Sequence, residues 1–133
     1  MMKIASIDVG LKRIGVATCL SGSVVMPNGA IERKNRNQAA RDVCSFLEEW
    51  SIDTLVVGVP KGGSSEDEMG RRIRHFVSLL ELSNTMAVYY QDEYGSSYEA
   101  KEQMRGEIKQ KRDGRIDSLA AKIILERWLE SRR

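Results

Sequence analysis

Residues 3–19 read KIASIDVGLKRIGVATC, and this stretch decides the fold because two apolar segments flank a short turn. Residues 3–7 are typical of a short buried strand that ends on Asp8, and Gly10 belongs to a tight turn. Residues 14–19 supply the next strand. A strand that follows so closely must run antiparallel to the first, since a parallel connection needs a dozen or more residues.

The pattern beyond this hairpin predicts one mixed sheet with helices on both faces. A third strand is expected over Val24–Ile31, interrupted in character by Pro27, Asn28 and Gly29, and it completes an antiparallel meander. Helical periodicity then alternates with continuous apolar runs. The expected elements are a helix over 37–50, a strand over 54–59, a helix over 69–80, a strand over 85–91, a helix after Gly95 and a last helix over 116–131. Because the two later strands should run parallel to the first, the fold class is α/β with a five-stranded sheet.

Length and composition favour a single soluble domain. The chain has 133 residues, which we expect to form one domain over residues 1–133, and 41% of them are hydrophobic. No run approaches the ~18 apolar residues of a membrane span, and no signal peptide is evident, so we expect a cytoplasmic protein. Two isolated cysteines and one histidine argue against a zinc site. A metal here would need oxygen ligands.

The net charge of +2 is unevenly distributed along the chain. Residues 1–100 contain 11 Lys and Arg against 13 Asp and Glu, a net charge of −2, whereas residues 101–133 contain 10 against 6, a net charge of +4. A basic C-terminal third indicates either a polyanion contact of limited area or an ordinary solvated surface.

Three acidic residues stand where the predicted sheet could bring them together. Asp8 and Glu93 each follow the end of a strand, and parallel strands end along one edge of a sheet, where ligands usually bind. Asp117 borders the apolar stripe of the last helix. Three carboxylates at one edge repel one another unless cations neutralise them. Mg²⁺ prefers such ligands, and a pair of ions can activate water and stabilise a leaving oxygen.

Each of these residues also has a simpler interpretation. Asp8 could begin the turn through Gly10, since Asp favours such positions. Glu93 could be a surface residue in a charged loop. Asp117 could be the N-cap of the last helix. The joint placement of the three favours the site.

Four motifs occur in order over essentially the whole chain: Asp8–Ala17, Val56–Pro60, Asp92-Glu93 with Ser96-Ser97 and Glu99-Ala100, and Ile116–Ala121 with Ile124-Leu125 and Trp128-Leu129. Together they resemble the YqgF family of pre-16S rRNA nucleases, also called Holliday-junction-resolvase-like proteins. One departure is Tyr94-Gly95, which stands where the family commonly has Arg-Leu.

The resemblance implies an RNase H-like fold and a catalytic, metal-binding triad of Asp8, Glu93 and Asp117, with Mg²⁺ or Mn²⁺ as cofactor. It implies a nuclease that trims the 5′ end of precursor 16S rRNA in ribosome maturation. The partner would be structured RNA or branched DNA, without a membrane, and the chain a monomer or weak homodimer. Open alternatives are a junction-resolving DNA endonuclease, a non-catalytic RNA-binding assembly factor, and an ATPase or kinase-like domain.

Charge and position also select residues that could contact the nucleic acid. Two follow the Asp8 turn and the others lie in a Gly-containing stretch before Asp117, although that stretch could equally be a solvated helix end. The candidates are Lys12, Arg13, Lys109, Lys111, Arg112 and Arg115.

Overall fold

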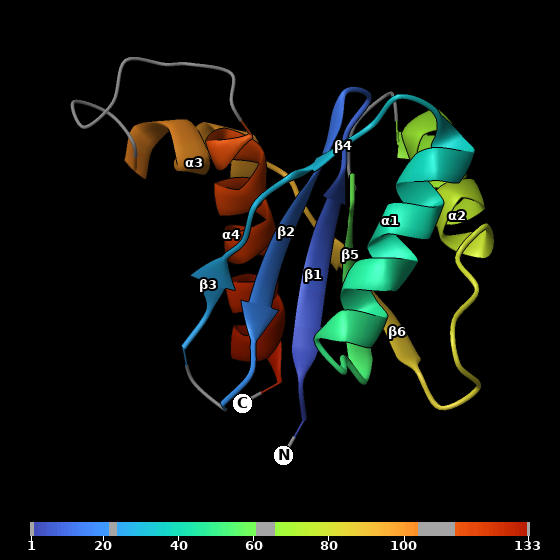
Figure 1. The fold of residues 1–133 in the computed structure, drawn as a ribbon. Coiled ribbons are helices and arrows are strands. Elements are labelled where there is room, and N and C mark those ends of the chain that lie inside the picture. The colour runs from blue at the N-terminus through green and yellow to red at the C-terminus, as the bar shows by residue number, and fades with distance from the viewer. Residues whose placement is uncertain (1, 22–23, 61–65, 104–113, 133) are drawn as a thin grey trace.

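A mixed sheet with β1 near its middle organises the molecule (Figure 1). The computed structural model describes residues 2–21, 24–60, 66–103 and 114–132. Within them the strands are β1 (Ile4–Val9), β2 (Arg13–Cys19), β3 (Met26–Pro27), β4 (Ile31–Glu32), β5 (Thr54–Val59) and β6 (Ala87–Asp92). The strand order is β3-β2-β1-β5-β6, and β4 also pairs with β2. As predicted, β1 is antiparallel to β2 and parallel to β5, and β6 is parallel to β5.

The predicted third strand is the main difference, because the structure splits it in two. Met26 and Pro27 pair with one end of β2 and Ile31 with the other, so the described residues form six strands where five were predicted. Pro27 has no N–H to donate, and Asn28 leaves the strand with its side chain 3.0 Å from Thr18 Oγ1. The ladder is therefore interrupted at the residues whose types had indicated a break.

Helices cover both faces of the sheet, as Figure 1 shows. The helices α1 (Arg36–Glu49) and α2 (Glu66–Ser78) lie on one face. On the other face lies α4 (Arg115–Ser131), with α3 (Ser96–Gln103) packed beside it. The start of α1 is fixed by Asn35, which accepts from Gln38 N at 2.8 Å while Gln38 Oε1 accepts from the Asn35 backbone.

Strand alternation divides the core into two layers. Ala5, Ile7 and Val9 pack with α1 and α2 in the larger cluster. Ile4 points the other way and packs with α4 residues such as Ile124 and Trp128. The face under α4 also holds small residues, and this allows the helix to approach the sheet closely.

The remaining predictions for the chain concern its cysteines and membrane spans. Both cysteines are free, and Cys19 is buried whereas Cys44 is half-buried. Among the described residues, no helix combines the length and apolar character that crossing a membrane requires.

Candidate active site

Asp8 projects from the penultimate position of β1 toward α4. Ser6, two residues earlier, donates from its Oγ to the Ala121 carbonyl oxygen of α4 at 2.7 Å. Because side chains alternate along a strand, Asp8 shares this face with Ser6. The Asp8 side chain is half-buried at the carboxyl end of the strand, which is where the sequence placed it.

Gly15 brings Asp117 to this position. Gly15 is the partner of Asp8 across the β1–β2 ladder. A Cβ built on Gly15 would overlap the backbone carbonyl of Asp117 and lie 3.0 Å from Ser118 N, so the first turn of α4 rests directly on β2. The Ser118 side chain accepts from Val16 N at 3.3 Å and fixes the register. The N-cap of α4 is Gly114, so the interpretation of Asp117 as the N-cap is wrong.

Gly58 has the corresponding role for Glu93. The backbone N–H of Glu93 donates to the Val59 carbonyl at 3.0 Å and continues the β5–β6 pairing beyond the end of β6. A Cβ on Gly58 would lie 3.0 Å from Glu93 Oε2 and 2.6 Å from Ile124 Cδ1. The Glu93 side chain therefore crosses β5 toward β1. A glycine inside an apolar strand is the sequence signal of such close approach, and it marks both positions.

The three carboxyl groups influence one another electrostatically. The pKa of Asp8 is raised well above its ordinary value of 3.8. Burial is the largest cause, followed by a hydrogen bond with the Glu93 side chain and by the negative charges of Glu93 and Asp117. Residues distant in sequence thus converge at the carboxyl edge of the sheet.

Arg13, predicted as a phosphate contact, instead forms an ion pair with Asp117. Its Nε donates to Asp117 Oδ2 at 3.0 Å, and the two side chains are only 17% and 34% exposed. A partly buried pair of this kind orients both groups. Of the other predicted contacts, Lys12 and Arg115 are exposed. Lys109, Lys111 and Arg112 lie outside the described residues.

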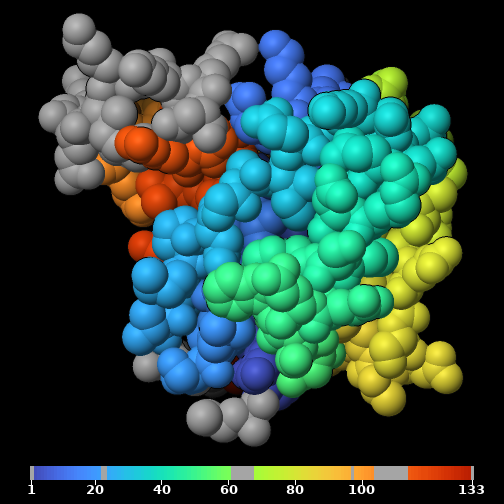
Figure 2. Space-filling model, viewed as in Figure 1, coloured from blue at the N-terminus to red at the C-terminus, as the bar shows by residue number. Residues whose placement is uncertain are grey.

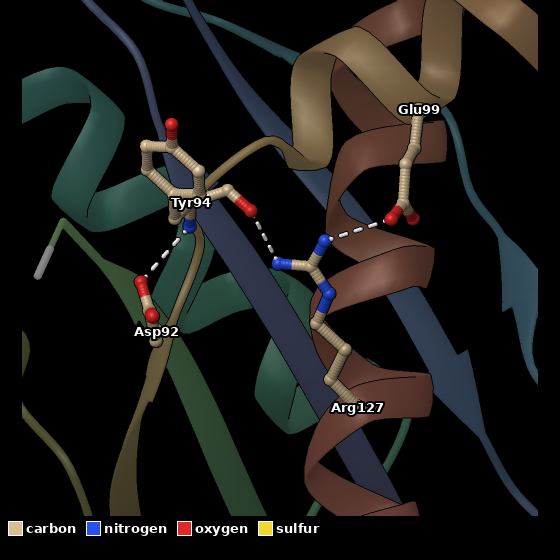
Figure 3. A network of polar contacts seen from close by, with 4 residues as sticks. All are labelled: Asp92, Tyr94, Glu99 and Arg127. Atoms are coloured by element: carbon tan, nitrogen blue, oxygen red, sulfur yellow. Dashed lines mark hydrogen bonds and ion pairs between the residues drawn. The ribbon is translucent and has the colours of Figure 1, made fainter.

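Arg127 of α4 holds the segment that carries Glu93, a role that no pattern in the sequence indicates. Its Nη1 donates to the Tyr94 carbonyl at 2.7 Å and its Nη2 to Glu99 Oε1 at 3.0 Å (Figure 3). On the other side of Glu93, the Asp92 side chain accepts from Tyr94 N at 2.9 Å. Tyr94 itself is 76% exposed. Tyr94 stands where the family commonly has an arginine, and Arg127 of α4 holds its carbonyl in place.

The donor chemistry of the site fits a divalent cation. Three carboxylates supply the hard oxygen ligands that Mg²⁺ and Mn²⁺ accept. Burial first, and the nearby Glu93 and Asp117 after it, raise the pKa of Asp8. In the described residues, no three His, Cys, Asp or Glu side chains are arranged to hold one ion as they lie, and Arg13 engages Asp117. Joint binding by all three would therefore require side-chain adjustment.

The fold is that of the RuvC-like resolvases, which are RNase H-like. A fowlpox virus resolvase crystallised with Holliday junction DNA superposes with a TM-score of 0.61 at 15% identity, covering 98% of each chain. The Thermus thermophilus RuvC in complex with a Holliday junction substrate gives 0.59 at 11%, covering 99% of this chain and 96% of RuvC. At these identities the likeness concerns the fold alone.

Sequence comparison identifies the family. The family model described as RuvX, Holliday junction resolvase, matches residues 2–131, and the chain belongs to this family, also known as YqgF. A protein of Sulfurovum sp. provisionally named pre-16S rRNA nuclease is 70% identical over 128 residues, covering 96% of this chain and 98% of the relative. One of Helicobacter hepaticus with the same name is 40% identical over 136 residues, covering 98% and 96%. The resemblance of the four motifs is confirmed.

Proposed function

We propose that the chain is a metal-dependent nuclease that hydrolyses phosphodiester bonds in precursor 16S rRNA and matures its 5′ end in the cytoplasm. The observation that carries the proposal is the convergence of Asp8, Glu93 and Asp117 at one sheet edge in a member of a nuclease family. The ribosomal RNA substrate follows the names of close relatives.

Asp8, Glu93 and Asp117 would hold Mg²⁺ or Mn²⁺ between them. A cation bound there supplies an activated water and stabilises charge on the leaving oxygen. Arg13 orients Asp117 from one side, and Arg127 steadies the segment around Glu93 from the other. Exposed Lys12 stands on the turn after Asp8, where it can bind a substrate phosphate. We keep a monomer or weak homodimer as the expected assembly.

The test is the substitution Asp8→Asn, which keeps the shape of the side chain and removes its charge. We expect Mg²⁺-dependent cleavage of a precursor 16S rRNA fragment to fall to background while circular dichroism shows an unchanged fold. Full activity of the variant would refute the assignment.

A four-way DNA junction is the second candidate substrate, since the family and two structural neighbours are junction resolvases. Parallel cleavage assays on both substrates decide between them. A non-catalytic assembly role predicts that Asp8→Asn rescues rRNA maturation in a deletion strain, whereas the nuclease role predicts no rescue.

A further inference from the structure

A basic cavity lies beside the carboxylate site, on the opposite face of the sheet from α4. Its volume is about 560 Å³. Four arginines and His75 line it together with apolar side chains, and none of the lining residues that the structure describes is Asp or Glu. The arginines are Arg33 and Arg36, from the start of the β4–α1 connection and the first position of α1, and Arg71 and Arg72, from α2.

Within the part of the chain that the structure describes, the charges of this cavity are only weakly compensated. Arg72 pairs with Glu68 at 2.8 Å, but both side chains are at least 60% exposed, so water screens the pair. Arg36 and Arg71 are also exposed. Guanidinium groups converging on a concave surface favour a planar or tetrahedral oxyanion such as phosphate, which they bind through paired N–H groups.

Arg33 joins the cavity to the β1–β2 turn, which follows Asp8. Its backbone N–H donates to the Lys12 carbonyl at 3.0 Å, and its Nη1 donates to the Gly10 carbonyl at 2.8 Å. Its guanidinium also lies over the Phe76 ring, 5.5 Å from the centroid. Two hydrogen bonds therefore link the cavity wall directly to the turn after Asp8.

The cavity is also close to the site of cleavage. Val9 lines it and directly follows Asp8, so their Cα atoms are about 3.8 Å apart. Figure 2 shows the β1–β2 turn at the top of the molecule, beside the residues that lead into α1 and the start of α2. Since a nucleic-acid strand advances about 3.4 Å per nucleotide along a helix axis, a few nucleotides would span from the carboxylates to the arginines.

We propose that this cavity binds the sugar-phosphate backbone of the nucleic-acid substrate a few nucleotides from the scissile bond. The inference deepens the proposed nuclease function and rests on it for the identity of the ligand. The arginines contact phosphates, and the apolar lining, including Leu11 with 71% of its surface exposed, contacts sugars or bases. The substrate then crosses the sheet edge over the β1–β2 turn and touches both faces of the protein.

The test compares two double variants that remove the same charge from the same two helices. The double variant Arg36→Gln with Arg71→Gln removes two of the four arginine charges that line the cavity. Arg41→Gln with Arg74→Gln is the control, because neither residue lines the cavity: Arg41 is exposed on α1, and Arg74 stacks on Tyr90 at 4.9 Å. Binding of a fluorescent precursor 16S rRNA fragment is measured by anisotropy in EDTA, where cleavage cannot occur, from 0.05 to 0.5 M salt.

For two lost phosphate contacts, we expect the slope of log K against log salt to decrease in magnitude by about 1.4–1.8. By that slope, affinity at 0.1 M salt falls by roughly 25- to 60-fold. The control should keep the wild-type slope within about 0.5. Equal loss in both variants, or no loss in the cavity variant, would overturn the proposal.

A small substrate separates this inference from the proposed function. Bis(p-nitrophenyl) phosphate, hydrolysed with Mn²⁺, reaches the carboxylates but not the cavity, so the cavity variant should keep the wild-type rate. A reduced rate would mean that the arginines act on the carboxylate site through the β1–β2 turn, and it would refute the proposal that the cavity is a binding site. If the wild-type protein cleaves nothing, the nuclease assignment fails, while the binding measurement still decides whether the cavity holds nucleic acid.

Discussion

Gly15→Ala adds one methyl group at the point where α4 rests on β2. A Cβ at this position would overlap the backbone carbonyl of Asp117 and lie 3.0 Å from Ser118 N. Both are backbone atoms within a helix, so no side-chain rotation can relieve the overlap. The first turn of α4 must move away from the sheet, and Asp117 must move with it.

The displacement needed is on the order of 1 Å, which is what restores an ordinary contact in a close-packed interior. Overpacking of this kind costs about 1–3 kcal/mol of unfolding free energy. For a domain of this size, Tm should fall by roughly 3–5 °C for each kcal/mol. A misplacement of about 1 Å in a catalytic group can cost on the order of 100-fold in rate. Activity should therefore suffer far more than the folded population at 25 °C.

The assay pairs thermal melting with single-turnover cleavage of the RNA fragment in saturating Mg²⁺. The matched control is Gly29→Ala, because a Cβ at Gly29 meets nothing within 4 Å, and it should leave both readouts unchanged. A wild-type cleavage rate constant and a wild-type Tm for Gly15→Ala would refute the close approach of α4. A lowered Tm with a wild-type cleavage rate constant would show that cleavage does not depend on the position of Asp117.

Two further substitutions test the surroundings of the site. Arg127→Met removes the donor to the Tyr94 carbonyl, so kcat should fall about tenfold, while stability falls by only about 0.5–1.5 kcal/mol; Arg127→Lys should recover part of the rate in the same cleavage assay. The pKa of Asp8 is higher in the folded chain than in the unfolded one, so the wild-type protein loses stability as pH rises between these two pKa values. Asp8→Asn has no charge to lose, and it should therefore raise Tm at pH 7. Melting curves should show this gain shrinking as pH falls toward 4, and a constant gain would contradict the burial of Asp8.

The strand-end position of Asp8 and the shared edge of β1, β5 and β6 could be predicted because they follow from local patterns. Apolar runs define strands, and the lengths of the connections decide whether neighbours are parallel. The glycines at positions 15 and 58 carried a further signal, since each breaks an apolar strand where another group approaches. Pro27 indicated a break in the third strand, but one strand was predicted where the structure has two.

Contacts between distant residues could not be predicted in this way. Arg13 and Asp117 are 104 positions apart, and nothing in either segment reveals that they pair. The basic cavity could not be predicted from the sequence for a related reason. Residues 1–100 carry a net charge of −2, yet the fold gathers Arg33, Arg36 and Arg71 from this part onto one concave surface. A net charge summed over a stretch of sequence does not show which charged residues lie close together after folding.

The placement of Asp117 on α4 has a consequence for the order in which the protein becomes active. A nascent chain that has emerged only as far as α3 already contains every strand of the sheet, together with Asp8 and Glu93. It lacks both the third carboxylate and the helix that covers Ile4, Ala17 and Val56. Docking of α4 therefore closes the second core layer and completes the acidic site in the same event. For the proposed nuclease, a chain whose last helix has not yet docked therefore lacks the complete site.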